Sequence, residues 1–275
     1  MSIRPAVPLV LTFLLLPAMV QAARIDVPPG TSLQTAVDAA APGDSLVLEP
    51  GTYPGAVVID KRLRIVGQGT AFIDPLGAAV GVDITADNVT IRVREGNGLG
   101  LAIGCATEAA LRVNGRDRVR VRSVQAGCFA PETAVGVDLT ALTRSSFKRV
   151  ISFGNTGLRV RQIGVRAGVS FSTVEGNGVG LGLLLEDIAA GGGRNTGVKI
   201  RSSLFTYNGG GTPVAVQLVN ADGTVLASSS LVSDLVLDAG SDDNLVRGCS
   251  MGTVTNLGTG NCFVNNQSPT PDVCP

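Results

Sequence analysis

The sequence contains no histidine and no tryptophan, and it has only two tyrosines. Without histidine the chain cannot use a Ser-His-Asp triad, a histidine-ligated metal or histidine acid–base chemistry. Charged residues make up 16% of the chain, below the roughly 25% of an average globular protein. Lys plus Arg and Asp plus Glu both number 22, so the formal net charge is +0. Because the basic excess typical of nucleic-acid binders is missing, we expect no nucleic-acid partner.

Glycine and apolar residues are what the chain does have. Its 275 residues include 36 glycines and are 44% hydrophobic, and the mean hydropathy is +0.33. This composition argues against disorder and suits a domain with a sizeable core. Lysine is scarce, so almost all of the positive charge is carried by arginine.

Residues 1–22 are predicted to be a secretory signal peptide. Arg4 gives a positive start, an apolar run follows over 7–20, and small residues precede the cleavage point. The run is shorter than the roughly 20 apolar residues that cross a bilayer, and Pro8 and Pro17 interrupt it. We therefore expect an extracytoplasmic protein, secreted or periplasmic, with no membrane span in the mature chain.

One short helix and many short strands are predicted after this segment. A capping-box pattern at Thr31–Gln34 starts a helix over 32–40, and Pro42-Gly43 ends it. Later segments such as 89–94 and 118–122 alternate apolar residues with Arg or Thr. This alternation is typical of strands with one buried face and one solvated face.

A short unit of glycine, apolar, variable and apolar residues recurs at irregular intervals of roughly 20 to 30 residues. Its copies are Gly81–Ile84, Gly100–Ile103, Gly136–Leu139, Gly157–Val160 and Gly180–Leu183. A doubly wound fold would need helices between the strands, and a sandwich would need closely spaced hairpins. We therefore predict an all-β chain, a right-handed parallel β-helix with a short N-terminal capping helix. It forms a single domain over 23–275, with a C-terminal tail from about 260 to 275.

The opening of this domain resembles that of pectin-lyase-like β-helix proteins. The resemblance covers 33–53 and 58–67, where a capping helix leads to a first strand and the turn Pro50-Gly51-Thr52-Tyr53. That superfamily includes pectate lyases, pectin esterases, polygalacturonases, epimerases and phage tailspikes. The resemblance implies the fold, and fold alone does not choose among these activities.

The variable positions of the unit predict an outward column along the coils. Its members are Asp83, Ala102, Asp138, Arg159, Gly182 and Gln217. Asp138 and Arg159 are expected to be neighbours, with Asp83 two coils away from Asp138, roughly 10 Å. A carboxylate beside an arginine can orient a uronic acid, act as a base or help to hold Ca²⁺. The alternative is an outward ion pair worth at most about 1 kcal/mol.

A second candidate site is a patch of arginines on two successive strands. Its members are Arg92, Arg94, Arg118, Arg120 and Arg122. The planar guanidinium pairs well with carboxylate and sulfate groups, which indicates an acidic polysaccharide or a cell-surface partner. Glu95 and Asp117 lie nearby, and a solvated strand face is the alternative.

The five cysteines suit an oxidising compartment. Cys105 and Cys128 are about one coil apart and are candidates for one disulfide, while Cys262 and Cys274 are candidates for a second that holds the tail. Cys249 would then remain free, and isolated buried thiols are the alternative. With no CxxC motif and no histidine, we expect no metal site.

Two functions remain open from the sequence. The first is a non-catalytic scaffold that binds a glycan or a surface partner and needs no cofactor. It is favoured by the missing histidine, the scarce aromatic residues and the lack of a dense carboxylate cluster. The alternative is a Ca²⁺-dependent polysaccharide lyase of the pectate-lyase type, with Asp138 and Arg159 in its site.

Overall fold

The computed structural model describes residues 21–93, 100–104, 106–127, 134–162, 168–188, 194–195, 197–209 and 214–274. Most of the predicted signal peptide lies outside these ranges. So do Arg94 in the predicted arginine patch and both Cys105 and Cys128 of the first predicted disulfide.

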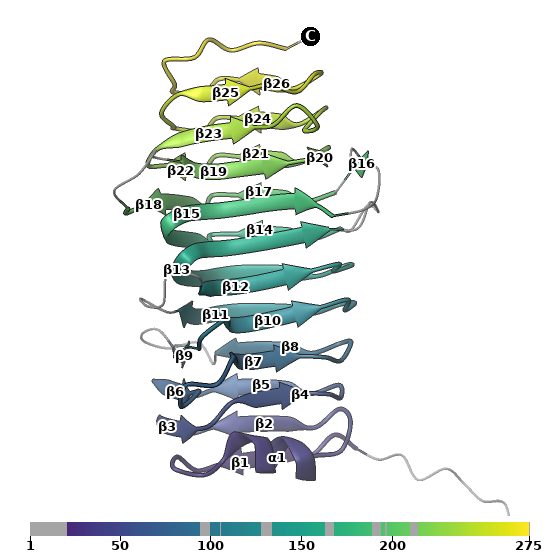
Figure 1. Cartoon of the computed structure of the whole chain (residues 1–275). Coiled ribbons are helices and arrows are strands. Elements are labelled where there is room, and N and C mark those ends of the chain that lie inside the picture. Colours follow the sequence, from purple (N-terminus) through teal and green to yellow (C-terminus); the bar gives the residue numbers. More distant parts are fainter. Residues whose placement is uncertain are drawn as a thin grey trace, which may run out of the picture.

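The chain winds into a stack of coils, with the N-terminal helix at one end and the C-terminus at the other (Figure 1). Each coil pairs in parallel with the coils before and after it, and the pairings form three ladders that run along the stack. The predicted right-handed parallel β-helix is confirmed.

The first ladder contains β1 (Arg24–Val27), β2 (Ser45–Leu48), β5 (Arg64–Gly67), β8 (Thr90–Val93), the start of β11 (Arg120–Gly127), the start of β13 (Ser146–Gln162), β14 (Ser170–Ser172), β17 (Lys199–Arg201), β21 (Val225–Ala227), β24 (Leu245–Arg247) and β26 (Cys262–Val264). The second contains β3 (Gly51–Pro54), β6 (Ala71–Asp74), β9 (Leu101–Ile103), later parts of β11 and β13, the start of β15 (Glu175–Asp187), β18 (Leu204–Tyr207) and β22 (Ser230–Leu231).

The third ladder contains β4 (Val57–Ile59), β7 (Val80–Ile84), β10 (Ala109–Asn114), β12 (Val135–Thr140), the ends of β13 and β15, β19 (Val214–Val219), β23 (Asp234–Leu237) and β25 (Val254–Asn256). A separate short pair joins β16 (Arg194–Asn195) to β20 (Ala221–Asp222).

The core is a line of apolar side chains inside each ladder, because alternate residues of a strand point to opposite faces. In the first ladder the inward residues in register are Leu46, Ile65, Ile91, Val121, Phe147, Phe171, Ile200, Leu226, Val246 and Phe263. The rings of Phe147 and Phe171 stack with their centroids 5.2 Å apart. Apolar side chains of one coil therefore pack on apolar side chains of the next coil.

The helix α1 (Leu33–Ala39) covers the N-terminal end of the stack through Leu33 and Val37, both fully buried. The predicted capping box is not formed, since the Ser32 side chain makes no capping hydrogen bond. Gln34 accepts a hydrogen bond from the backbone N–H of Val58 at 2.7 Å. Val58 lies on the first strand of the third ladder, so its N–H has no earlier strand to pair with.

The Pro-Gly-Thr-Tyr turn has a direct physical basis. Gly51 has a φ of 139°, and a Cβ there would lie 2.4 Å from the Cβ of Pro29, so no larger residue fits. The buried hydroxyl of Tyr53 lies 2.8 Å from the carbonyl oxygen of Val27 and 2.7 Å from that of Glu49. Tyr53 thus ties the turn to the first strand.

From β11 onward, the corner between the first and second ladders is made by a single residue with positive φ. These residues are Ser123, Arg149, Thr173, Ser202, Ser228, Gly248 and Asn265. The next residue points inward and changes along the stack, as Val124, Val150, Val174, Ser203, Ser229, Cys249 and Asn266. In the later coils this side chain accepts a hydrogen bond from the backbone of the coil before it. Ser203 Oγ accepts from Val174 N–H and Ser229 Oγ accepts from Ser203 N–H, both at 3.2 Å.

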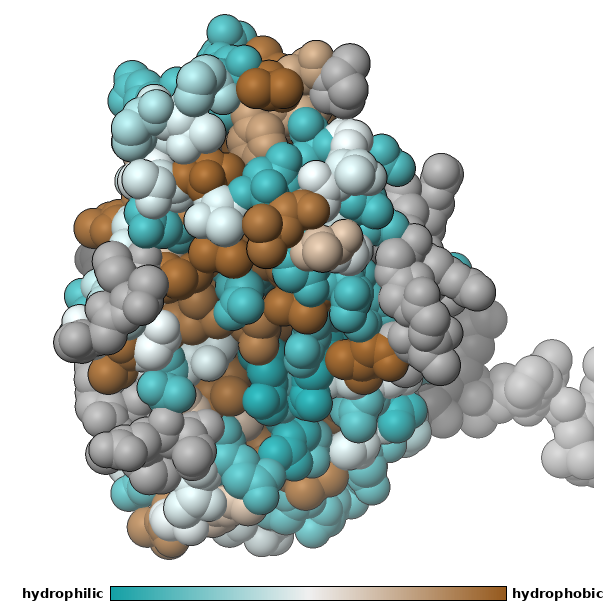
Figure 2. Space-filling model, turned by 45° about the horizontal axis from the view of Figure 1, so that its top comes forward, coloured by the Kyte–Doolittle hydropathy of each residue, from teal (hydrophilic) through white to brown (hydrophobic). Residues whose placement is uncertain are grey.

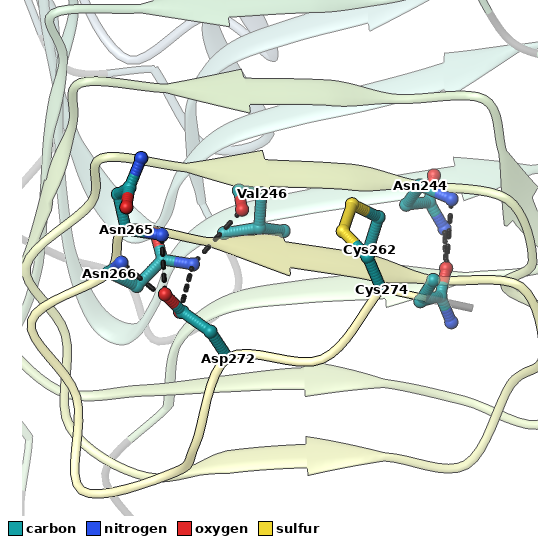
Figure 3. Close-up of a disulfide and its surroundings, with 8 residues drawn as sticks. Asn244, Val246, Cys262, Asn265, Asn266, Asp272 and Cys274 are labelled. Carbon is teal, nitrogen blue, oxygen red and sulfur yellow. Dashed lines mark hydrogen bonds between the residues drawn. A yellow bond between two sulfur atoms is a disulfide. The ribbon is translucent and has the colours of Figure 1, made fainter.

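The C-terminal end is closed by a segment held against the last coil (Figure 3). Cys262 and Cys274 form a disulfide, the pair that the sequence suggested, and Cys249 is free and buried. The Asp272 carboxylate accepts hydrogen bonds from the backbone N–H groups of Asn265 and Asn266 at 2.5 and 3.2 Å. β26 pairs with β24, and the described residues after β26 form no named strand.

Over the described residues, no helix has the length and apolar character that crossing a membrane requires.

Candidate functional site

Charged side chains alternate in sign along the outward side of the third ladder. Strand register places Asp83, Arg112, Asp138 and Arg159 opposite one another in that order. The structure therefore brings Asp138 beside Arg159, and Asp83 lies two coils from Asp138. Two members of the predicted column are wrong. Ala102 lies on β9 in the second ladder, and the residue opposite Arg159 on the next coil is Leu184 rather than Gly182.

Asp138 is held by two arginines at once. Its Oδ1 accepts hydrogen bonds from Arg159 Nε at 3.0 Å and Arg161 Nη2 at 3.2 Å. Its Oδ2 accepts from Arg159 Nη2 at 2.7 Å and Arg161 Nη2 at 3.0 Å. The Asp138 side chain is 2% exposed, whereas the two arginine side chains are 30% and 31% exposed. The hydrogen bonds to Asp138 raise the pKa of Arg159.

This geometry suits a structural ion pair better than a catalytic base. Both carboxylate oxygens of Asp138 are occupied, and the arginines stand between the carboxylate and solvent. The same arrangement does not fit Ca²⁺, whose ligands are free oxygen atoms. Within the ranges described, no group of three His, Cys, Asp or Glu side chains is placed to hold a metal ion.

Asp83 has a different environment from Asp138. Burial raises the pKa of Asp83, while the positive charges of Arg112 and Arg116 act in the opposite direction. Arg112 itself pairs with Glu108 at 2.5 Å. Sequence reasoning missed both Arg112 and Arg161, although Arg161 lies two positions after Arg159 and thus on the same side of its strand.

From β5 onward, the charged side chains on the outward side of the first ladder are all basic. From β5 to β26, the charged residues on the strands of this ladder are Arg64, Arg92, Arg120, Arg122, Lys148, Lys199, Arg201 and Arg247, all exposed, and these strands hold no Asp or Glu. We call these eight residues the basic face. Arg92, Arg122 and Lys148 are directly opposite one another on three successive coils.

The basic face includes three of the five arginines predicted as a patch: Arg92, Arg120 and Arg122. Arg118 is not on it, because it precedes β11 with a φ of 55°. Its guanidinium lies 3.2 Å from the Asp117 carboxylate and 3.2 Å from the Asn88 side-chain oxygen. The other five residues of the basic face were missed in the sequence, because only the register of the coils shows that they lie on the same side of the molecule.

Two hollows open onto the N-terminal part of the basic face. One, of about 310 Å³, is lined by Arg24, Ser45, Val47, Arg64, Val66, Gln68 and Arg92. The other, of about 320 Å³, is lined by Gly43, Arg62, Leu63, Arg64, Asn88, Thr90 and Arg120. Arg64 borders both, so anionic groups in the two hollows would share it.

A larger groove of about 520 Å³ follows the corner between the first and second ladders in the later coils. It is lined by Thr173, Val174, Glu175, Ser202, Ser203, Leu204, Ser228, Ser229, Ser230, Gly248, Cys249, Ser250, Asn265 and Gln267. Its surface is rich in hydroxyl groups, and Glu175 is its one charged lining residue. Cys249 is 1% exposed, and this burial raises the pKa of its thiol. A buried thiol with a raised pKa is not a reactive nucleophile.

On the face seen in Figure 2, hydrophilic residues gather toward the lower middle and lie among hydrophobic residues.

Solved structures share this architecture. An alginate lyase from Paenibacillus sp. str. FPU-7 aligns with a TM-score of 0.51 at 14% identity, covering 90% of this chain and 99% of that one. The A-module of a mannuronan C-5 epimerase from Azotobacter vinelandii gives 0.43 at 13%, covering 86% and 89%. A pectate lyase gives 0.47 at 12%, covering 92% and 80%.

No protein-family model matches the chain, and no curated protein matches it in sequence. At the identities of the structural matches the likeness concerns the fold alone. The chain is a parallel β-helix protein.

Proposed function

We propose that the protein is an extracytoplasmic, non-catalytic protein that binds acidic polysaccharide along its basic face. The observation that carries this proposal is the separation of charge. A chain with a formal net charge of +0 places eight cations and no anion on the strands of one ladder from β5 onward.

Arginine suits such a ligand because its planar fork pairs with carboxylate and sulfate oxygens. Successive coils are about 4.8 Å apart, close to the length of one pyranose unit in an extended chain. A polyuronate offers one carboxylate per sugar, so its charges recur at about the spacing of the coils. The fold of the chain, shared with an alginate lyase, is compatible with a polysaccharide ligand.

Catalysis is not favoured at Asp138, since both of its carboxylate oxygens are held by Arg159 and Arg161. The calcium-dependent lyase suggested by the sequence has no carboxylate with free oxygens at that position. An exported location is supported by the predicted signal peptide over 1–22 and by the Cys262–Cys274 disulfide.

Binding to alginate, polygalacturonate and heparin, with dextran as the neutral polymer, tests the proposal. The combined variant Arg92→Ser, Arg122→Ser and Lys148→Ser should weaken binding to the acidic polymers at least tenfold. A matched control, Arg112→Ser, Arg118→Ser and Arg144→Ser, removes the same charge from other surfaces and should change it less than threefold.

Binding of the wild-type chain should fall with added salt, because exposed charges are screened. Equal losses in the two triple variants, or no binding to any acidic polymer at low salt, would overturn the proposal. Release of unsaturated sugars from any of these polymers, with or without Ca²⁺, would replace it with the lyase.

A further inference from the structure

The basic face has an internal division. Arg64, Arg92, Arg120, Arg122 and Lys148 occupy four consecutive coils and form an N-terminal cluster. The next coil contributes Ser170 and Ser172 from β14. A C-terminal cluster of Lys199, Arg201 and Arg247 then follows.

Register places the two clusters on one line. Lys148 lies opposite Ser172, and Ser172 lies opposite Arg201. Ala227 then separates Arg201 from Arg247. With coils about 4.8 Å apart, the N-terminal cluster spans about 14 Å, and Arg64 to Arg247 spans about 34 Å.

The cations form a narrow line that runs along the stack of coils, with at most two of them on any one strand. A ligand that runs around one coil meets at most two cations, such as Arg120 and Arg122, before it leaves the ladder. A ligand that runs along the third ladder instead meets charges of alternating sign, with Asp83, Arg112 and Asp138 on successive coils. A ligand that runs along the stack meets a cation on most coils.

Resting on the proposed function, we infer that a linear polyanion lies parallel to the axis of the coils and bridges both clusters. The N-terminal cluster is the primary site, because the two hollows that share Arg64 lie there. The C-terminal cluster then engages the same ligand molecule, so its contribution appears only when the ligand can span the serine coil.

The affinity should therefore increase with ligand length in two steps. Oligouronates of about four units cover the N-terminal cluster at one unit per coil, and about six units are needed to reach Arg201. Affinity should rise up to about four units, remain nearly level, and then rise again by at least about tenfold beyond six.

Size-defined oligouronates of two to twelve units, measured by titration calorimetry at one fixed ionic strength, test this inference. The variant Lys199→Ser, Arg201→Ser and Arg247→Ser should abolish the second rise and leave the affinity for tetramers within twofold. Ser172→Arg should fill the gap and turn the two steps into one continuous rise. Ser250→Arg adds the same charge on the second ladder and should preserve both steps.

The outcomes separate this inference from the proposed function. Tight binding of long polymers with a smooth length dependence, or an unchanged curve in the C-terminal variant, overturns the bridging geometry alone. No binding of any oligomer or polymer overturns both. Binding to vesicles of phosphatidylcholine with 30 mol% phosphatidylglycerol, without binding to oligouronates, also overturns both in favour of a membrane surface.

Discussion

Asp138 shows how a charge can be buried without becoming reactive. Its carboxylate is almost fully buried, but Arg159 and Arg161 supply donors to both oxygens. Removing a partner from a buried pair leaves an uncompensated charge, which costs far more than breaking an exposed pair. The stability of the third ladder should therefore depend on this carboxylate.

Asp138→Ala should lower the free energy of unfolding by about 2 kcal/mol. This is below the roughly 3–5 kcal/mol of a fully buried pair, because the two arginine side chains keep 30% and 31% of their exposure. Urea unfolding at pH 7 measures it. Asp26→Ala, which breaks the exposed pair with Arg24 at 2.9 Å, is the control and should cost less than about 1 kcal/mol. Equal costs in the two variants would refute the assignment.

Tyr53 predicts a stability change at alkaline pH. Burial, with a contribution from the charge of Glu49, raises the pKa of Tyr53 from 10.0 to about 12. The folded chain thus holds this proton more tightly than the unfolded chain. Its contribution is fully present below about pH 10 and is lost as the pH rises toward 12.

Tyr53→Phe should remove that alkaline loss and cost about 1 kcal/mol at pH 7, because the hydrogen bond to the Val27 and Glu49 carbonyls is gone. Unfolding in urea at a series of pH values from 7 to 12 tests both effects. Tyr207→Phe should retain the alkaline loss of the wild type. A Tyr53→Phe curve parallel to that of the wild type would contradict the argument.

Among the structural elements, the single-residue corners between the first and second ladders are the feature that repeats most regularly. From β11 onward, six of the seven corner residues are not glycine, although a left-handed backbone costs such residues roughly 1–2 kcal/mol. Gly248 is the exception, with a φ of 58°. A Cβ at this position would meet only Ser228 Oγ, at 3.9 Å.

Gly248→Ala therefore isolates the backbone cost and should destabilise the protein by about 1 kcal/mol. Ser228→Gly, at the equivalent corner one coil earlier, should act in the opposite direction by up to about 1 kcal/mol, reduced by the added freedom of the unfolded chain. Thermal unfolding of both variants measures these changes. A stabilised Gly248→Ala variant would show that contacts decide this corner.

The elements also show which parts of the fold could be predicted from the sequence. Alternation and recurrent glycines were sufficient for the β-helix and for the opposition of Asp138 and Arg159, whose units both begin with glycine. Arg112 was missed because β10 has no such glycine, and the unit chosen in its place, Gly100–Ile103, forms β9 of the same coil. The error at Gly182 is a choice between two overlapping glycine units, because Gly182–Leu185 rather than Gly180–Leu183 lies opposite Gly157–Val160. Tertiary register decides these positions, and local pattern does not contain it.

At the scale of the whole molecule, a stack of parallel strands has two open ends that can pair with other chains. The α1 helix covers the first end, and its own Leu33 and Val37 side chains are fully buried in the core. Leu33→Asp should detach this cover and cause concentration-dependent self-association. Light scattering coupled to size-exclusion chromatography detects it, and Thr35→Asp, on the exposed side of the helix, should remain monomeric. Identical elution of the two variants at high concentration would contradict a protective role.

The change of the inward corner residues from Val124, Val150 and Val174 to Ser203, Ser229, Cys249 and Asn266 implies a direction for unfolding. Coils that touch only their neighbours behave as a one-dimensional zipper, which opens from its weaker end. The later coils replace apolar corner contacts with hydrogen bonds to the adjacent backbone. Unfolding of the coils should therefore begin at the C-terminal end, where the Cys262–Cys274 disulfide holds the last coil together.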